Sequence, residues 1–425
     1  MSPHGLRVRR LARDRRAIAA SLGDGRPLGR VLEVRSGLSD PHDDGHTVAV
    51  VRFASGLCVV YKPRPVGLEA AFARLVEWWN RPAGGLALLA PRVVDRGAYG
   101  WMEFVVHEGC AGPEAASRYY ERAGALIALA GLLDATDLHC GNVIAHGEYP
   151  VLVDLETLLQ PRWPGEERSL LDTGLVPSWI RGPDGGRYDV SGFGAIAPQQ
   201  FRGAAVPVRE NVLRIGAAIV SPQAYADRLV SGFVRAGELL CARRDELLAT
   251  DGPLAGFDRR EVRVILRHTE TYRAARDGGA LERESLLRPV GDPRVLAAIG
   301  WTEDAALARG DIPRFVAATD RGEWTPHPTL TIEGCFAVRG YDALIARARR
   351  LAPADYEEQA QLLRTALALW DLGGGLAENG SGGSGRAAPQ GPTPIVQQHH
   401  EDDIEQRGSR KQEEDKATHR RGVFL

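Results

Sequence analysis

The stretch that decides the fold is Thr136-Asp137-Leu138-His139-Cys140-Gly141-Asn142, followed by Asp154-Leu155-Glu156-Thr157. Asp137 and Asn142 stand five positions apart in a polar segment, and Asp154 closes a short apolar run. Carboxylate and amide oxygens are the hard ligands that Mg²⁺ prefers in proteins. The stretch therefore predicts a polar loop, a strand that ends in Asp154, and a magnesium site formed by Asn142 and Asp154.

The same spacing occurs in the catalytic loops of kinases. There the aspartate orients or deprotonates the attacking hydroxyl, while the asparagine and a later aspartate bind magnesium. Asp137, Asn142 and Asp154 fit these three roles in order. Each residue also has a structural interpretation, since Asp137 would cap a turn, Asn142 would stabilise a loop, and Asp154 would be an exposed strand end.

A lysine that would complete such a site stands earlier in the chain. Lys62 is the single lysine of the first 410 residues, although the chain has 53 lysines and arginines. A compact ammonium and a planar guanidinium are not interchangeable, and lysine suits a point contact with phosphate in a tight space. We therefore predict that Lys62 lies on a strand and neutralises nucleotide phosphates. A surface lysine retained by chance is the alternative.

Hydrophobic periodicity predicts strands and helices around this loop. The first part favours a hairpin at residues 46–53 and 57–62 and a helix at 66–80. A strand at 101–106 and a longer helix at 114–133 follow. From residue 191 to residue 371 the pattern is mainly helical, for example at 223–248, 258–276 and 341–371.

These elements predict an α+β, kinase-like bilobal fold. A small β-rich lobe is expected at 1–110, and a large lobe with a mainly helical C-terminal part at 111–371, with the catalytic loop at the centre. Residues 37–45 take the place of a glycine-rich phosphate loop without its motif, which favours a lipid-kinase-like lobe. Residues 372–425 lack apolar periodicity and predict a disordered, low-complexity tail.

Composition and cysteine usage exclude several classes of function. The net charge of −2 gives no general attraction to nucleic acid, and the chain contains no apolar run long enough to span a membrane. The arginine-rich residues 1–16 fit either a nucleic-acid-binding arm or an amphipathic helix, and their apolar spacing favours the helix. Five scattered cysteines without a CxxC pair predict no disulfide framework and no zinc site, and they fit a cytoplasmic protein.

The residues above belong to longer motifs that resemble a known family. The motifs are Ser39-Asp40-Pro41-His42, Tyr61-Lys62-Pro63-Arg64, Tyr99-Gly100-Trp101-Met102-Glu103-Phe104, Thr136-Asp137-Leu138-His139 with Asn142, Gly147 to Leu158, Thr173 to Pro177, Arg263 with Arg267-His268-Thr269, and Gly310-Asp311-Ile312-Pro313. On these motifs the chain resembles the dehydratase domain of class II lanthipeptide synthetases of the LanM type, over roughly residues 6–371.

The resemblance implies an activity and a set of site residues. In that family, Ser and Thr of a ribosomally made precursor peptide are phosphorylated with ATP and Mg²⁺, and phosphate is then eliminated in lantibiotic biosynthesis. It assigns six residues to phosphorylation: Lys62, Asp137, His139, Asn142, Asp154 and Glu156. Among these, Lys62 and Glu156 would bind the nucleotide, and Asn142 and Asp154 would bind the metal. It assigns Arg263 and Thr269 mainly to elimination, and Asp40 and His42 match phosphate-loop positions needed for processing.

Physical reasoning from the residues leaves some of these roles open. Arg263 suits a departing phosphate because its fork binds two oxygens, and Thr269 would offer a hydroxyl on the same helix face. In a chain this rich in arginine, the residue by itself favours a structural role for Arg263, and the functional role is what the resemblance implies. His139 would orient Asp137 or act as acid and base, or it is structural. Glu156 would bind a second metal or cap the segment at Thr157.

The chain departs from the family pattern at several points. Gly141 stands where the family has glutamate, and Arg314 stands where it has an aromatic residue. The family's N-terminal region and its zinc-binding cyclase domain have no counterpart in this sequence, so we expect no ring formation by this chain and a separate cyclase as a partner. Two alternatives follow, a truncated remnant that binds peptide without turnover and a peptide kinase without elimination.

Overall fold

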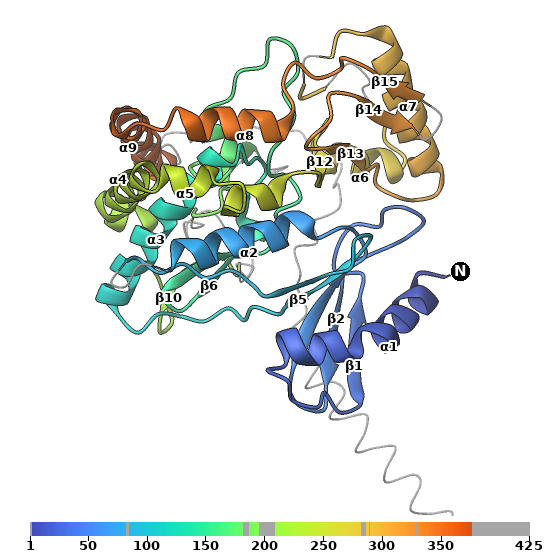
Figure 1. Ribbon diagram of the computed structural model, residues 1–425, viewed down its shortest axis with the longest axis horizontal. Helices are drawn as coiled ribbons and strands as arrows, with labels where there is room; N and C mark the ends of the chain where they lie inside the picture. Colours follow the sequence, from blue (N-terminus) through green and yellow to red (C-terminus); the bar gives the residue numbers. More distant parts are fainter. Residues whose placement is uncertain are drawn as a thin grey trace, which may run out of the picture. The chain divides into compact units, whose positions relative to one another are not determined.

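The computed structural model describes residues 2–81, 85–181, 187–194, 209–281, 286–288, 290–327 and 330–375. All of them belong to one compact unit of the chain. Helices and small antiparallel sheets alternate along this unit (Figure 1), so the α+β class predicted from the sequence is confirmed.

The N-terminal part is built on one five-stranded antiparallel sheet. Its strand order is β1-β2-β3-β5-β4, with β1 at Val31–Ser36, β2 at Ala49–Phe53, β3 at Cys58–Lys62, β4 at Val93–Asp95 and β5 at Gly100–Glu103. Lys62 is the last residue of the central strand β3 and pairs with Gly100 of β5. The hairpin and the strand position predicted for Lys62 are therefore confirmed.

Helix α1, at Pro3–Leu22, packs on this sheet and covers β4 and β5. Its buried Asp14 accepts hydrogen bonds from the Tyr99 hydroxyl at 2.7 Å and from the Trp101 indole at 3.0 Å. Ile18 is fully buried against the sheet, whereas Val8 is exposed. The arginine-rich N-terminal segment is thus a helix with one anchored face, as its apolar spacing predicts.

Two predicted helices form the centre of the larger part. Helix α2 runs over Gly67–Trp79 and helix α3 over Pro113–Leu132, with Pro113 in the first turn, where a missing N–H costs nothing. Helix α4, at Ala226–Ala242, crosses α3 in close contact. A Cβ on Gly124 would lie 1.9 Å from the Leu229 carbonyl oxygen, so the two backbones meet where only glycine fits.

The site segment follows α3 directly. A short 3-10 turn at Cys140–Asn142 leads into the hairpin of β6, at Val143–His146, and β7, at Tyr149–Leu152. The strand predicted to end in Asp154 ends two residues earlier, because β7 stops at Leu152 and Asp154 lies in the loop that follows. Asp154 therefore lies two residues beyond the end of the strand, and its side chain contacts Lys62 and Arg64.

The long helix predicted at residues 258–276 is wrong. A short helical turn at Pro253–Phe257 is followed by strand β12 at Glu261–Val264, which pairs with β13 at Phe315–Ala318, and helix α6 covers only Thr269–Arg276. Arg263 therefore lies on a strand, and Thr269 opens the next helix. The partner strand is some fifty residues away, so local periodicity could not reveal the pairing.

Other predicted helices are divided. Residues 223–248 form α4 and the short α5 at Arg244–Leu248, and residues 341–371 form α8 at Gly340–Arg349 and α9 at Pro353–Gly375. The remaining described α-helix and strands are α7 at Pro293–Ala308, β8 at Trp179–Arg181, β9 at Arg187–Asp189, β10 at Arg214–Ile215, β11 at Ala218–Ile219, β14 at Trp324–His327 and β15 at Leu330–Ile332. Helix α9 includes the first residues of the predicted tail, and residues 376–425 lie outside the described ranges.

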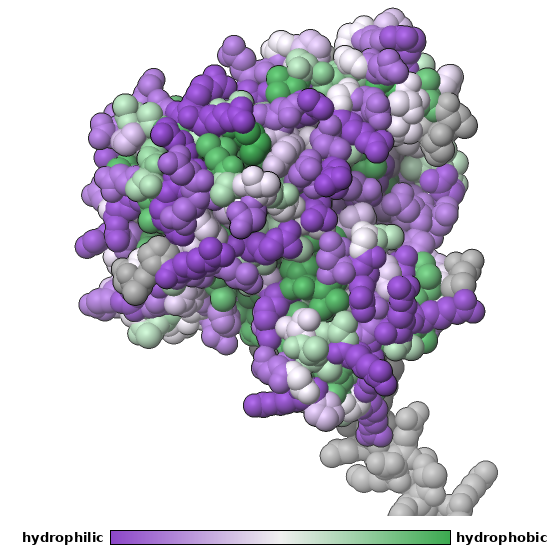
Figure 2. Space-filling model, viewed as in Figure 1, coloured by the Kyte–Doolittle hydropathy of each residue, from purple (hydrophilic) through white to green (hydrophobic). Residues whose placement is uncertain are grey.

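All five cysteines are free, as their spacing predicts. In the part of the chain that the structure describes, no helix is long and apolar enough to cross a membrane. The face drawn in Figure 2 is mostly hydrophilic, with apolar residues in smaller separate areas.

Candidate functional site

Lys62 is buried at the end of β3 and makes three short contacts. Its ammonium donates to Asp154 Oδ1 at 3.0 Å, to the Val153 carbonyl at 2.8 Å and to Glu69 Oε1 at 3.3 Å. Lys62 is 5 % exposed and Glu69 is 2 % exposed, so the ion pair between them is shielded from water. The lysine points toward Asp154, so these two residues of the predicted site lie side by side.

Arg64 lies beside Lys62 and shares its carboxylate partners. Its guanidinium contacts Asp154, Glu69 at 2.7 Å and Glu156 at 2.9 Å. Burial opposes the charge of Arg64, but the three carboxylates, Glu156 foremost, raise its pKa well above the usual value. Burial likewise opposes ionisation of Asp154, yet Lys62 and Arg64 together lower its pKa. The carboxylate of Asp154 is thus held in its charged form.

Glu156 is surrounded by arginines. Arg64 Nε lies 2.9 Å from Oε2, Arg263 Nη1 donates to Oε1 at 2.8 Å, and Arg314 Nη2 lies 3.7 Å from Oε2. Burial opposes the charge of Glu156, but these three guanidinium groups lower its pKa strongly. Glu156 therefore organises a cluster of cations, and in this structure its carboxylate contacts arginines on both oxygens.

The pairing of β12 with β13 brings two of these arginines to one face. Arg263 stands opposite Val316, so Arg314 is its diagonal neighbour on the same side of the ladder. Val262 and Val264 face the core on the other side. The Nε of Arg314 is buried and has no hydrogen-bond partner among the described residues, while its Nη2 contacts Glu261 at 2.8 Å.

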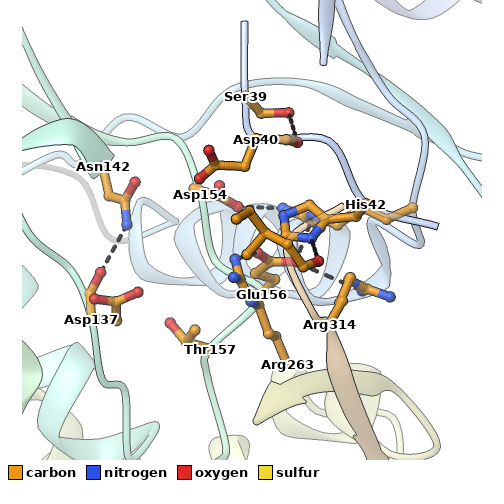
Figure 3. A network of polar contacts seen from close by, with 12 residues as sticks. Ser39, Asp40, His42, Asp137, Asn142, Asp154, Glu156, Thr157, Arg263 and Arg314 are labelled. Atoms are coloured by element: carbon orange, nitrogen blue, oxygen red, sulfur yellow. Dashed lines mark hydrogen bonds and ion pairs between the residues drawn. The ribbon is translucent and has the colours of Figure 1, made fainter. Parts of the chain in front are cut away.

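The loop from Asp137 to Asn142 is closed by its own side chains. The Asn142 amide nitrogen donates to the Asp137 carbonyl at 2.8 Å, and the Gly141 N–H donates to His139 Nδ1 at 3.0 Å. Asp137 has a φ of 61°, a left-handed conformation that aspartate tolerates. Figure 3 shows the Asn142 amide nitrogen turned toward Asp137 and its amide oxygen turned away.

Burial tunes the acid–base groups of this loop. Burial, together with the nearby Asp154 and Glu156, raises the pKa of Asp137 although His139 and Arg263 oppose the shift. Burial lowers the pKa of His139, but its contacts with Cys140 and Asp137 outweigh burial and raise it. A carboxylate with a raised pKa is a better proton acceptor, which is the property that a general base requires.

Asn142 and Asp154 belong to neighbouring stretches of backbone, since the Val153 N–H donates to the Asn142 carbonyl at 3.0 Å. Their hard oxygens fit the donor set that Mg²⁺ uses when phosphates and water supply the remaining ligands. Within the described ranges, no three His, Cys, Asp or Glu side chains are grouped as a metal site.

The turn at Asp40 to His46 lies against the C-terminal part of the unit. Arg273 binds both carboxylate oxygens of Asp40, at 3.0 and 2.9 Å. His42 Nδ1 lies 2.7 Å from the Ile312 carbonyl oxygen, which can only accept, so Nδ1 carries the proton and the neutral ring has its lone pair on Nε2. Burial, and the charge of Arg263, lower the pKa of His42.

The structure unites most of the residues predicted from the sequence. Figure 3 shows His42, Glu156, Arg263 and Arg314 in one polar network with Asp154. Thr269 is half-buried at the first residue of α6 and, within the described residues, is not among the contacts of Glu156.

Sequence reasoning did not single out four residues that contact this network or hold the turn of His42: Glu69, Arg64, Arg314 and Asp311. Glu69 gave a usable signal, because it is a charged residue on the apolar face of a helix that follows the lysine strand. Arg64 and Asp311 were quoted only as members of motifs. Nothing in the local pattern distinguished Arg64 from the many other arginines.

The sequence that forms this α+β domain and its arginine cluster matches a known family model. The model, described as a domain of unknown function (DUF4135), covers residues 7–318. The chain belongs to this family.

The chain is also similar to the lacticin 481/lactococcin biosynthesis protein LcnDR2 of Lactococcus lactis subsp. lactis. The two are 24 % identical over 332 residues, which cover 64 % of this chain and 33 % of the relative. The chain thus spans about a third of the relative's length.

Proposed function

We propose that this protein dehydrates Ser and Thr residues of a ribosomally made precursor peptide in lantibiotic biosynthesis, by ATP-dependent phosphorylation followed by phosphate elimination. The observation that carries the proposal is the contact of buried Lys62 with Asp154 and with helix residue Glu69. A strand lysine paired with a helix glutamate, followed by an Asp/Asn loop and a further aspartate, is the arrangement of kinase sites. A kinase-like fold is part of this proposal.

The relative's name supports the peptide substrate, since it is a lacticin 481/lactococcin biosynthesis protein. That name describes a protein about three times as long as this chain's matched region, so both the substrate and the activity are proposed here. A cytoplasmic location belongs to the same proposal.

In the phosphorylation step, the substrate hydroxyl attacks the γ-phosphorus of ATP, the bond to the leaving ADP oxygen breaks, and Asp137 takes the hydroxyl proton. Asn142 and Asp154 would hold Mg²⁺, which supplies positive charge to the nucleotide phosphates. Lys62 is placed to add a fixed positive charge beside Asp154. The raised pKa of Asp137 suits its role as proton acceptor.

In the elimination step, a base removes the α-proton, the C–H electrons form the Cα–Cβ double bond, and the Cβ–O bond breaks as phosphate departs. His42 is a suitable base, because its Nδ1 proton is committed to the Ile312 carbonyl and Nε2 carries the lone pair. Arg263 and Arg314 offer guanidinium groups for the phosphate leaving group.

The experiment is an incubation of the protein with ATP, Mg²⁺ and the precursor peptide encoded beside its gene, followed by mass spectrometry. We expect a transient gain of about 80 Da and a final loss of about 18 Da per residue, from one phosphoryl added and one water lost overall. A stable gain without loss would identify a peptide kinase. An unmodified peptide that still binds would identify a binding protein, and either result would overturn the proposal.

A further inference from the structure

The turn that carries His42 is held in place by Asp311, a residue from far along the chain. Asp311 is 2 % exposed, and its two carboxylate oxygens accept the backbone N–H groups of Asp44, at 2.8 Å, and Gly45, at 2.9 Å. A buried carboxylate with both oxygens bonded to backbone donors forms strong, charge-assisted hydrogen bonds. Asp311 therefore fixes the backbone of the turn rather than a side chain.

Two further contacts join the same segments. The Ile312 N–H donates to the Pro41 carbonyl at 2.8 Å, and the Ile312 carbonyl accepts from His42 Nδ1 at 2.7 Å. Four hydrogen bonds thus connect residues 41–45 to residues 311–312. They involve residues 41, 42, 44 and 45 of the turn, so the backbone and the imidazole are oriented together.

The conformation of the turn explains why it needs such an anchor. Asp43, Asp44 and Gly45 have φ values of 48°, 70° and 80°, all in the left-handed region. Two consecutive non-glycine residues in this region are unfavourable and persist when surrounding contacts determine the backbone. The N–H groups at 44 and 45, which this conformation presents side by side, are the two that Asp311 accepts.

We infer that Asp311 is a positioning residue, which holds the 41–45 turn so that the imidazole of His42 faces the arginine cluster at Glu156. Resting on the proposed function, this assigns Asp311 a part in phosphate elimination exerted through His42. Figure 3 draws His42 beside Glu156, Arg263 and Arg314, and the charges of these three residues act on its pKa. Asp311 would thereby act on the base of the reaction through the backbone of the turn.

The test compares Asp311→Asn with wild type in two measurements that need no catalytic activity. Hydrogen exchange should accelerate at amides 44 and 45 by about tenfold or more, because the amide side chain loses charge and one acceptor. The pKa of the His42 ring, followed by NMR and assigned with His42→Asn, should move from its lowered value toward about 6.5. Unchanged exchange and an unchanged His42 pKa would overturn the inference.

A third measurement connects the turn to the reaction. With a synthetic phosphoserine form of the precursor peptide, the elimination rate of Asp311→Asn should fall about 100-fold, the effect expected of a displaced catalytic group. Its KM for the peptide should change little. If wild type shows no elimination, the proposed function fails, while the exchange and NMR results still decide the role of Asp311.

Two variants complete the design. Asp342→Asn removes an exposed carboxylate on α8 and should match wild type in all three measurements. Asp311→Glu keeps the negative charge near Arg309 but displaces it by one methylene, so it serves if Asp311→Asn does not fold. It should show the same changes in smaller measure, and wild-type behaviour of a folded Asp311→Glu would contradict the inference.

Discussion

Arg263 is joined to Glu156 twice. Its backbone N–H donates to the Glu156 carbonyl at 2.7 Å, and its guanidinium donates to the Glu156 carboxylate at 2.8 Å. Strand β12 and the loop after β7 are therefore fixed to each other by main chain and side chain together. The position of one arginine in the site depends on the charge of one glutamate.

Glu156→Gln should destabilise the protein, by about 3–5 kcal/mol at pH 7, because buried guanidinium groups lose their shared partner. The pKa of Glu156 is lowered in the folded state, so its contribution is complete above the unfolded value of about 4.3. It declines as pH falls from there and is lost once pH passes the folded pKa. In denaturant unfolding, the difference in the free energy of unfolding between wild type and Glu156→Gln should become smaller as pH falls below about 4.

Glu323→Gln is the matched control, since Glu323 is exposed and pairs only with exposed Arg321 among the contacts described. It should unfold like wild type at each pH. A gap between wild type and Glu156→Gln that stays constant from pH 7 to pH 3 would show that the charge of Glu156 does not stabilise the fold.

Lys62→Ala should reduce peptide phosphorylation by about 10²–10³-fold, the loss found when one preorganised charge-stabilising donor is removed. Elimination from a synthetic phosphopeptide should be retained, because the contacts of Glu156 with Arg263 and Arg314 do not include Lys62. Lys62→Arg tests whether a compact ammonium is needed. Full activity of Lys62→Arg would contradict the argument from the isolation of this lysine.

Arg263→Ala should separate the two half-reactions. Phosphorylation has Lys62 for charge stabilisation, whereas elimination builds charge on the departing phosphate, which a bidentate guanidinium binds well. Mass spectra should therefore show phosphopeptide accumulating at about +80 Da per site instead of the loss of about 18 Da. Exposed Arg321→Ala should process the peptide as wild type does. Equal loss of both steps would indicate that Arg263 is structural or contacts ATP.

Local patterns predicted the elements that carry the site. The apolar spacing of α2 and the proline that opens α3 are signals contained within a few residues. The loop at Asp137 and Asn142 follows α3 directly, so its place was also local information. These parts were predictable because each depends on neighbours in the sequence.

The arginine cluster was not predictable in the same way. Arg263 was placed on a helix, since the alternating Glu261–Val264 is only four residues long and merged with the helical pattern beyond it. Its true position depends on pairing with β13, far along the chain. Likewise, the role of Asp311 at the 41–45 turn is a contact between segments more than 260 residues apart, which no local pattern encodes.

His42 should give the elimination reaction a distinct pH dependence. Burial, followed by Arg263, lowers its pKa, and a base acts only when unprotonated. The elimination rate should rise with pH through a value below about 6.5 and then level off. Arg314→Gln removes one of the cations that lower this pKa. The rise of the elimination rate with pH should therefore occur at higher pH in this variant than in wild type. The same pH dependence of the elimination rate in wild type, Arg314→Gln and His42→Asn would exclude His42 as the base.

Gly141 has no side chain, which allows the His139 ring to lie over the backbone of the loop. A Cβ at position 141 would lie 2.9 Å from His139 Cε1 and 3.2 Å from Nδ1, so Gly141→Ala should turn the ring away. The pKa of His139, now raised by its contacts with Cys140 and Asp137 against the effect of burial, should then fall toward about 6.5 in an NMR titration.

Phosphorylation by Gly141→Ala should fall by at least about tenfold if His139 orients Asp137 or transfers protons, since general acid–base groups contribute at least this much. Gly291→Ala is the control, because no heavy atom lies within 4 Å of a Cβ built there. A displaced ring with undiminished phosphorylation would make His139 a structural residue of the loop. The Gly141→Ala variant therefore distinguishes a role of His139 in catalysis from a structural role in the loop.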